Sequence, residues 1–353
     1  MDTKRMGPIE QESTSAGAVA ELDVICAPIR DEMDRLAAFL AGEFESREPF
    51  LHAILSHIAS FRGKRLRPAL LFLFHKLARG RVTDDLIKIG AVLEMIHTAT
   101  LVHDDLLDAA ELRRQVATVH CRWGDRPAIL IGDYIYSRAF ELSTQVPGMA
   151  GVLARTTTEI CEGELLQIGH RFKPRLEEEV YLEIIRKKTA ILHAVACELG
   201  GRLAQVDEPI SRAFHGFGLD VGTAFQVIDD CLDFAGDEEV VGKSLGTDLH
   251  QGKMTLPLIL LRERLSPDER LWLESVLVAP LAPEDEERIR ALVSEHGVIG
   301  DCLVRAQEMV DCARERLVFA ATALTSARGA GAVDEEVLEC LRVAAAYVLE
   351  RKR

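Results

Sequence analysis

Hydrophobic residues recur at the three- and four-residue spacing of helices along most of the chain, and short polar or Gly- and Pro-containing breaks separate these stretches. No run of useful length alternates hydrophobic and polar positions between hairpin signals, so no strand is predicted. The pattern predicts helices near residues 17–45, 48–61, 68–79, 83–108, 127–145, 149–171, 175–200, 209–235, 254–262, 267–279, 284–295, 300–324 and 334–351. The chain is therefore expected to be all-α.

The chain offers no long break at which two domains would separate. Residues 1–16 are small and polar, and they are expected to form a disordered tail. Later breaks, such as Gly80-Arg81 and Pro147-Gly148, span only a few residues. A single all-α domain over residues 17–353 is predicted.

Two predicted helices are apolar almost all round, which is typical of buried helices. They cover residues 86–102 and 218–234. Each ends in two adjacent aspartates followed by a third aspartate three residues later. The six aspartates are Asp104, Asp105, Asp108, Asp229, Asp230 and Asp233.

These acidic clusters lie where a helix tolerates them least. The C-terminal end of a helix carries a partial negative charge, which disfavours anions and favours cations. Side chains four residues apart are neighbours roughly 5–6 Å apart on one face, so each cluster also repels itself. Mg²⁺ prefers carboxylate oxygens and often bridges to substrate phosphates. The pattern therefore predicts Mg²⁺ ligands that face each other around a diphosphate; the alternative is two solvated helix ends.

Composition narrows the class of protein. Hydrophobic residues make up 48% of the chain and aromatic residues only 5%, which together favour a large helical core. The net charge of −15 argues against a nucleic-acid partner. The eight cysteines form no CxxC pair, as expected for reduced thiols in the cytosol. No apolar run is expected to approach the length needed to span a bilayer, so we predict a cytoplasmic protein with at most peripheral membrane contact.

Basic residues cluster near the acidic ones in this acidic chain. Lys64 and Arg67 lie at a predicted helix start, with Pro68 expected at the first helical position. Such a start, with free N–H groups, is a candidate anion site. The other basic residues that we single out are Arg113, Arg114, Lys188, Lys243 and Lys253. Each alone fits a solvated surface charge, but together they indicate phosphate binding.

The ordered motifs resemble those of the trans-isoprenyl diphosphate synthases (polyprenyl synthetases), over roughly residues 45–351. The matching segments are GKRLRP at 63–68, EMIHTATLVHDDLLD at 94–108, RRQVATVH at 113–120, GDYIYSRAF at 132–140, EGELLQ at 162–167, KTA at 188–190, FQVIDDCLDF at 225–234 and GKSLGTDLHQGKMTLP at 242–257. The resemblance implies an all-α bundle around a deep central cavity, usually a homodimer. It also implies head-to-tail condensation of isopentenyl diphosphate with an allylic diphosphate. Gln115 departs from the family pattern, which usually has Gly there.

The resemblance assigns a role to each candidate residue. The six aspartates would hold Mg²⁺ on the allylic diphosphate. Arg113, Lys188 and Lys253 would bind that diphosphate, and Lys243 would close over it. Thr189 and Gln226 would aim oxygen dipoles at the carbocation.

A second group of residues is assigned to isopentenyl diphosphate by the same resemblance. It comprises Lys64, Arg67, His97 and Arg114. A histidine on an apolar helix is more often a core residue, so only its motif position supports His97. His103 is expected to be structural, because nitrogen is not a favoured Mg²⁺ ligand.

In this family the residues four and five before the first aspartate gate the elongation tunnel, and here they are Thr100 and Ala99. Both are small, so the resemblance implies a long product, such as the side chain of a respiratory quinone. Alternatives are a short-chain (farnesyl or geranylgeranyl) synthase, a terpene cyclase and a subunit of a heteromeric synthase. A helical face near 127–145 is the predicted contact with a second copy.

Overall fold

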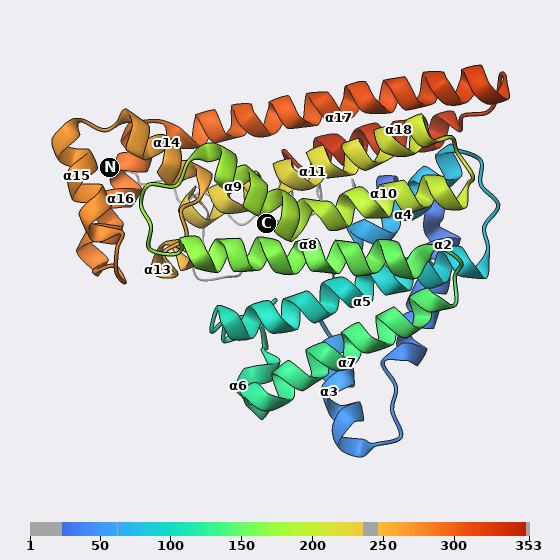
Figure 1. The fold of residues 1–353 in the computed structure, drawn as a ribbon, viewed down its shortest axis with the longest axis horizontal. Helices are drawn as coiled ribbons and strands as arrows, with labels where there is room; N and C mark the ends of the chain where they lie inside the picture. Colours follow the sequence, from blue (N-terminus) through green and yellow to red (C-terminus); the bar gives the residue numbers. More distant parts are fainter. Residues whose placement is uncertain (1–22, 62, 236–245, 351–353) are drawn as a thin grey trace, which may run out of the picture.

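The computed structural model describes residues 23–61, 63–235 and 246–350. Almost all of its regular structure is helical, so the all-α prediction is confirmed (Figure 1). In chain order the elements are η1 (Ala27–Ile29), α2 (Arg30–Glu43), α3 (Pro49–Ala59), α4 (Leu66–Leu77), α5 (Asp84–Leu107), β1 (Leu112–Arg113), β2 (Val116–Ala117), α6 (Val119–Trp123), α7 (Asp125–Thr144), α8 (Met149–His170), α9 (Glu178–Ile185), η2 (Arg186–Ala190), α10 (Ile191–Leu203), α11 (Glu208–Ala235), α13 (Thr247–His250), α14 (Leu256–Arg264), α15 (Pro267–Val276), α16 (Pro283–Glu295), α17 (Val298–Arg328) and α18 (Glu335–Tyr347).

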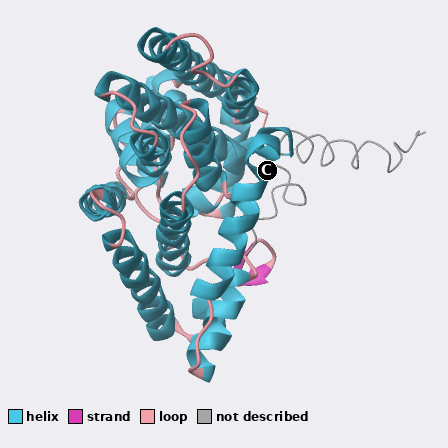
Figure 2. Cartoon of the chain, turned by 90° about the vertical axis from the view of Figure 1, so that its right-hand side faces the viewer, coloured by secondary structure: helices cyan, strands magenta, loops and turns pink. Residues whose placement is uncertain are grey.

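The long helices pack side by side as a bundle (Figures 1 and 2). Helix α11 lies between α10 and α17, and α10 also packs on α4. Helix α5 runs along α7 and α4, with α8 against η2. The predicted tail, residues 1–16, lies outside the described residues.

The start of helix α5 is determined by its local sequence, and its apolar composition is explained by its burial. The Thr83 side chain accepts a hydrogen bond from the Leu86 N–H, and Asp84 and Asp85 occupy the first turn, where acids are favoured. By length and composition alone α5 could cross a membrane, with a mean hydropathy of 1.3 over an 18-residue window. The prediction that no apolar run reaches this length was therefore wrong. The same window is 61% buried inside the fold, which accounts for its apolar composition.

Other boundaries differ from the prediction for local reasons. Helix α4 begins at Leu66, so Pro68 is the third helical residue and not the first. This position is tolerated because the first four N–H groups of a helix have no intrahelical acceptor. The helix predicted over 175–200 is three elements, α9, the π-helical turn η2 and α10.

The structure also contains a small hairpin, where no strand was predicted. Strands β1 and β2 pair antiparallel and contain two residues each, too few to show an alternating pattern. Arg114 and Gln115 connect them, with φ values of 51° and 65°. A two-residue hairpin turn of this kind requires positive φ at both positions and usually contains Gly or Asn. Gln115 adopts the left-handed conformation that a glycine there would reach without strain.

Candidate functional site

The two aspartate clusters lie at the ends of α5 and α11, and Lys253 and Asp248 connect them. Lys253 Nζ lies 3.3 Å from Asp108 Oδ2 and 3.3 Å from Asp248 Oδ1. The backbone N–H of Asp248, in α13, donates to Asp233 Oδ2 at 3.2 Å. Asp108 of the first cluster and Asp233 of the second are therefore connected through Lys253 and Asp248.

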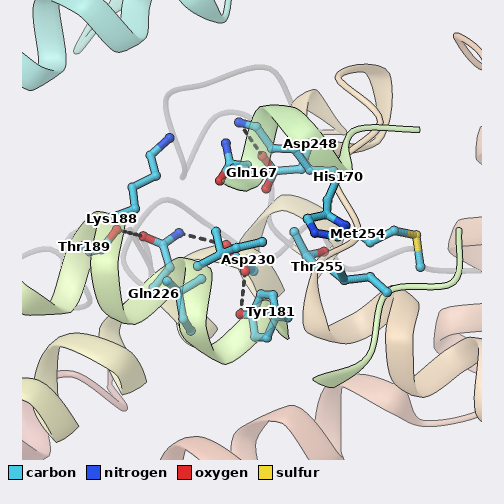
Figure 3. A pocket seen from close by; sticks show the side chains of 14 residues that line it. Gln167, His170, Tyr181, Lys188, Thr189, Gln226, Asp230, Asp248, Met254 and Thr255 are labelled. Carbon is cyan, nitrogen blue, oxygen red and sulfur yellow. Dashed lines mark hydrogen bonds and ion pairs between the residues drawn. The ribbon is translucent and has the colours of Figure 1, made fainter. Parts of the chain in front are cut away.

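A pocket opens beside this link, between α8, α9, η2, α11 and the segment that leads into α14 (Figure 3). Lys188, Asp230 and Lys253 are among its lining residues. Gln167 Nε2 and Thr255 Oγ1 are buried at its wall and have no hydrogen-bond partner within the described part of the chain. Buried polar atoms normally have partners, so these two indicate that the pocket receives a polar ligand.

The three acids at the end of α5 have different surroundings. Asp105 is buried and accepts three hydrogen bonds of 2.6–2.9 Å from the Arg113 guanidinium. Asp108 accepts one of 2.8 Å from Arg171. Asp104, one turn before Asp108, is only partly buried. Arg113 therefore orients Asp105, and Asp104 and Asp108 are the two partly buried acids on this helix end.

The π-helical turn η2 brings a cation to Asp104. A Cβ on Gly163 would lie only 2.6 Å from the Lys188 backbone nitrogen, so glycine lets α8 approach η2 closely. This approach pairs the Lys188 ammonium with Glu164, and the same nitrogen lies 4.0 Å from Asp104 Oδ1. π-Helical turns often occur at functional sites, and this one presents Lys188 and Thr189 to the pocket.

Hydrogen bonds order the second cluster. Asp230 is buried and accepts from Tyr181 Oη at 2.7 Å and from Gln226 Nε2 at 2.8 Å. Thr189 Oγ1 donates to Gln226 Oε1 at 2.9 Å. Thr247 Oγ1 donates to Asp233 at 3.1 Å. The cluster is therefore an arranged network and not a set of independent solvated acids.

Burial raises the pKa values of three of these acids. It raises the pKa of Asp104 to about 6, and the charge of Glu164 adds to the increase. Burial also raises the pKa of Asp233 to about 6 and that of Asp230 to about 8, with the charge of Asp248 contributing to both. Buried carboxylates that resist ionisation gain from a nearby cation, which favours their charged form.

The donor set fits a divalent cation that binds together with a phosphate. Among the described residues no group of three or more His, Cys, Asp or Glu side chains forms a ready metal cage. Mg²⁺ is commonly held by one or two carboxylates plus substrate phosphates and water. Asp104, Asp108, Asp229 and Asp233 offer only oxygen, which suits a hard cation. Their assignment as metal ligands stays a prediction.

Three of the four residues predicted for isopentenyl diphosphate lie near one another. Burial lowers the pKa of His97 far below its usual value, and the charges of Arg67 and Arg114 act in the same direction. The imidazole is therefore neutral and acts as a hydrogen-bonding group. Arg114 is held by the Phe61 carbonyl oxygen at 3.0 Å. Lys64 donates to Tyr347 Oη of α18 at 2.6 Å.

The remaining candidates have varied positions. Ala99 is fully buried, and Thr100 Oγ1 donates to the His97 carbonyl oxygen at 2.8 Å. His103 Nε2 lies 3.1 Å from the Ile129 carbonyl oxygen, in agreement with a structural role. Lys243 lies outside the described residues.

Sequence reasoning missed four residues of the site. Glu164 and Asp248 fall inside motifs that we noted for other residues, so their acidic character was the available signal. Arg171 and Tyr181 contact Asp108 and Asp230, but each is a single residue with no pattern around it.

Comparison with known proteins gives consistent matches. A family model described as polyprenyl synthetase matches residues 48–296. The all-trans-nonaprenyl-diphosphate synthase (geranyl-diphosphate specific) of Rhodobacter capsulatus is 33% identical over 298 residues, which cover 83% of this chain and 90% of that protein. Heptaprenyl diphosphate synthase component 2 of Bacillus subtilis is 39% identical over 234 residues, 65% of this chain and 67% of that protein. The crystal structure of a polyprenyl synthase from Caulobacter crescentus with calcium and isoprenyl diphosphate aligns with a TM-score of 0.86 at 33% identity, and covers 94% of this chain and 98% of that one.

Replacing Lys253 should destabilise the fold, because Lys253→Gln leaves Asp108 and Asp248 facing each other without their shared cation. Breaking a fully buried ion pair costs roughly 3–5 kcal/mol, and these partly exposed groups should lose about 2 kcal/mol of unfolding free energy. Denaturant unfolding measures the change. Lys173→Gln, at an exposed position, is the matched control and should change stability by less than about 0.5 kcal/mol. Equal stability of the two variants would show that Lys253 does not link the clusters.

Proposed function

The chain belongs to the polyprenyl synthetase family and is a trans-prenyl diphosphate synthase, and from this premise we propose that it uses Mg²⁺ to make a long all-trans-polyprenyl diphosphate. The substrates are isopentenyl diphosphate and an allylic diphosphate. The observation that carries the proposal is the connection between the two acidic clusters, in which Lys253 lies between Asp108 and Asp248, and Asp248 binds Asp233.

The residues around the pocket supply two kinds of interaction. Lys188 and Lys253 are cations that can hold a diphosphate, and both line the pocket. A divalent cation bound by the aspartates would neutralise the charge that develops on the departing diphosphate. Thr189 and Gln226 place neutral oxygens next to this region, where they favour positive charge on carbon.

The proposed reaction has three steps: ionisation, condensation and loss of a proton. The C–O bond of the allylic diphosphate breaks, and its electron pair leaves with the diphosphate. The double bond of isopentenyl diphosphate attacks the resulting carbocation and forms a new C–C bond. A proton is then lost to the departed diphosphate, which restores a double bond. The chain's part is to hold both diphosphates and to keep water away from the cation.

The small residues of α5 support a long product. Ala99 is fully buried and has buried Met95 and Val92 on the preceding turns of the same helix. No aromatic ring occupies position 99 or 100, so neither side chain would stop an elongating chain there. We propose a product beyond geranylgeranyl length, used as the side chain of a respiratory quinone in the cytoplasm. The short-chain alternative predicts a product of four isoprene units or fewer.

An apolar surface of α7 supports a homodimer. Ile129, Leu130, Tyr134 and Phe140 are exposed on this helix, and Leu165 is exposed on neighbouring α8. Adjacent large hydrophobic side chains of this kind mark protein contact sites. The relative that is named as component 2 of a heptaprenyl synthase raises a second candidate, in which a different subunit covers this surface.

The purified chain alone should convert farnesyl diphosphate and isopentenyl diphosphate to a polyprenyl diphosphate of more than four isoprene units when Mg²⁺ is present. Chelation of the metal should abolish product, because the diphosphate then leaves without charge neutralisation. Mass analysis of the products measures both the product length and its loss after chelation. A chain that forms product only after a second subunit is added would support the heteromeric candidate, and products of C20 or less would support the short-chain one.

A larger side chain at position 99, in the α5 turn that precedes Asp104, should shorten the product. Ala99→Phe places a ring where the growing chain would pass, so mass analysis should show fewer isoprene units than for the wild type. Ala313→Phe on α17, at an equally buried alanine, controls for overpacking of the core. An unchanged product length with Ala99→Phe would contradict the tunnel along α5.

Introducing a charge on α7 should separate a homodimer. Leu130 is 67% exposed, and Leu130→Glu would bury an unpaired carboxylate in the contact. Light scattering should then report half the wild-type mass at the same helical content. Leu271→Glu is the matched control, since Leu271 is 62% exposed on α15. A wild-type chain that is already monomeric would contradict the homodimer.

A further inference from the structure

A row of four polar side chains joins the second acidic cluster to the neutral oxygens of the pocket (Figure 3). Tyr181 donates to Asp230 Oδ2 at 2.7 Å, and Gln226 Nε2 donates to Asp230 Oδ1 at 2.8 Å. Thr189 donates to Gln226 Oε1 at 2.9 Å. The row runs from α9 through α11 to η2, and all four residues line the pocket.

The donors and acceptors along this row determine which way the Gln226 amide is oriented. Asp230 accepts a hydrogen bond from each of its two partners, whereas an amide has one accepting end and one donating end. Because Asp230 accepts, Gln226 must turn its Nε2 toward Asp230 and its Oε1 toward Thr189. The accepting end of Gln226 therefore lies on the side of Thr189 and Lys188, where the substrate is proposed to bind.

Tyr181 is the group that holds Asp230 in this role. Tyr181 is 3% exposed and Asp230 is 4% exposed, so water contributes little to fixing the carboxylate. Rotation about the terminal torsion of an aspartate is soft, and hydrogen-bond partners decide its plane. Without the Tyr181 hydroxyl, Oδ2 would lose its 2.7 Å donor. The carboxylate could then turn, and the Gln226 amide would no longer have a single orientation.

We propose that Tyr181 is a positioning residue that acts through Asp230 to keep the Gln226 carbonyl oxygen facing the carbocation. This inference rests on the proposed function, since it concerns the ionisation of the allylic diphosphate. It also gives Asp230 a different task from the metal ligation predicted for it. Asp230 is buried, whereas Asp229 and Asp233 of the same cluster are partly exposed, so the proposal leaves metal binding to those two and to the acids of α5.

Tyr181→Phe tests the role, because it removes the hydroxyl and keeps the ring that fills the core. One hydrogen bond between neutral or partly buried groups changes a rate by up to about 10-fold when it acts only in the transition state. The expected result is a kcat lower by that factor. The KM values for both diphosphates and the half-saturating Mg²⁺ concentration should stay within about twofold, because the affected interaction forms in the transition state. An unchanged kcat, or a raised Mg²⁺ requirement, would overturn the proposal.

Tyr347→Phe provides the matched control. Tyr347 is also 3% exposed, and its hydroxyl accepts a hydrogen bond from Lys64. Its loss should raise the KM for isopentenyl diphosphate and leave kcat within about twofold. The two variants thus remove the same atom from equally buried tyrosines and should affect different kinetic constants. A drop in kcat of equal size in both would show a general loss of packing.

A double-mutant cycle shows whether Tyr181 acts through Gln226. If it does, Tyr181→Phe combined with Gln226→Ala should be no slower than Gln226→Ala alone. Losses that multiply would overturn the route through Gln226.

Asp230→Asn gives a second measure that does not depend on how Tyr181→Phe folds. Its carboxamide is nearly isosteric but no longer accepts at both ends, so kcat should fall with an unchanged Mg²⁺ requirement. A raised requirement would instead identify Asp230 as a metal ligand. A wild-type chain without product would overturn the proposed function and this role with it, whereas an active wild type with an unaffected Tyr181→Phe would overturn this role alone.

Discussion

Carboxylates held at the C-terminal ends of two buried helices are the constraint on which the site depends. Both the helix dipole and burial disfavour negative charge at these positions. Burial, together with neighbouring acids such as Glu164 and Asp248, raises the pKa values of Asp104, Asp230 and Asp233. Apolar packing along α5 and α11 offsets the unfavourable free energy of placing carboxylates at their ends. Cations and hydrogen-bond donors near these carboxylates stabilise their charged form, so both kinds of group are favoured at this place.

The protein supplies some of those cations itself. Arg113 binds Asp105, Arg171 binds Asp108, and Lys253 lies between Asp108 and Asp248. These contacts connect the end of α5 to the end of α8 and to the segment between α13 and α14. The same lysine belongs to the group that is proposed to bind a diphosphate, so one side chain would both brace the site and meet its substrate.

The acidic clusters could be predicted from sequence because their signal is local. An apolar helix that ends in three spaced aspartates is visible within about twenty residues of sequence. The partners of these acids could not be found in this way. Tyr181 lies 49 residues from Asp230, and Arg171 lies 63 residues from Asp108. Only the packing of α9 on α11 and of the end of α8 near α5 brings them together, and a single tyrosine or arginine carries no periodic pattern.

Smaller misses have equally physical causes. The hairpin of β1 and β2 has two residues in each strand, and a pattern of period two needs more positions than this. Helix α4 begins after Arg65, whose φ of 48° is left-handed. An arginine does not indicate this conformation in the sequence, so the start of the helix could not be predicted from it. The π-helical turn adds a residue to one helical turn, which a count of apolar positions over 175–200 reads as a continuous helix.

Two rigid elements each pair a charged group with a neutral oxygen, and this pairing is what the proposed chemistry requires. On η2, Lys188 is adjacent to Thr189; on α11, Gln226 precedes Asp229 by three residues, about 4.5 Å along the axis. The charged members suit a diphosphate and its metal, and the neutral oxygens suit a cation on carbon. A carbocation next to a full carboxylate would be captured by it, whereas an amide or hydroxyl oxygen stabilises the cation through its dipole and bonds less readily. Because both pairs are set by helical geometry and not by loops, the distance between the leaving group and the cation is fixed before substrate binds.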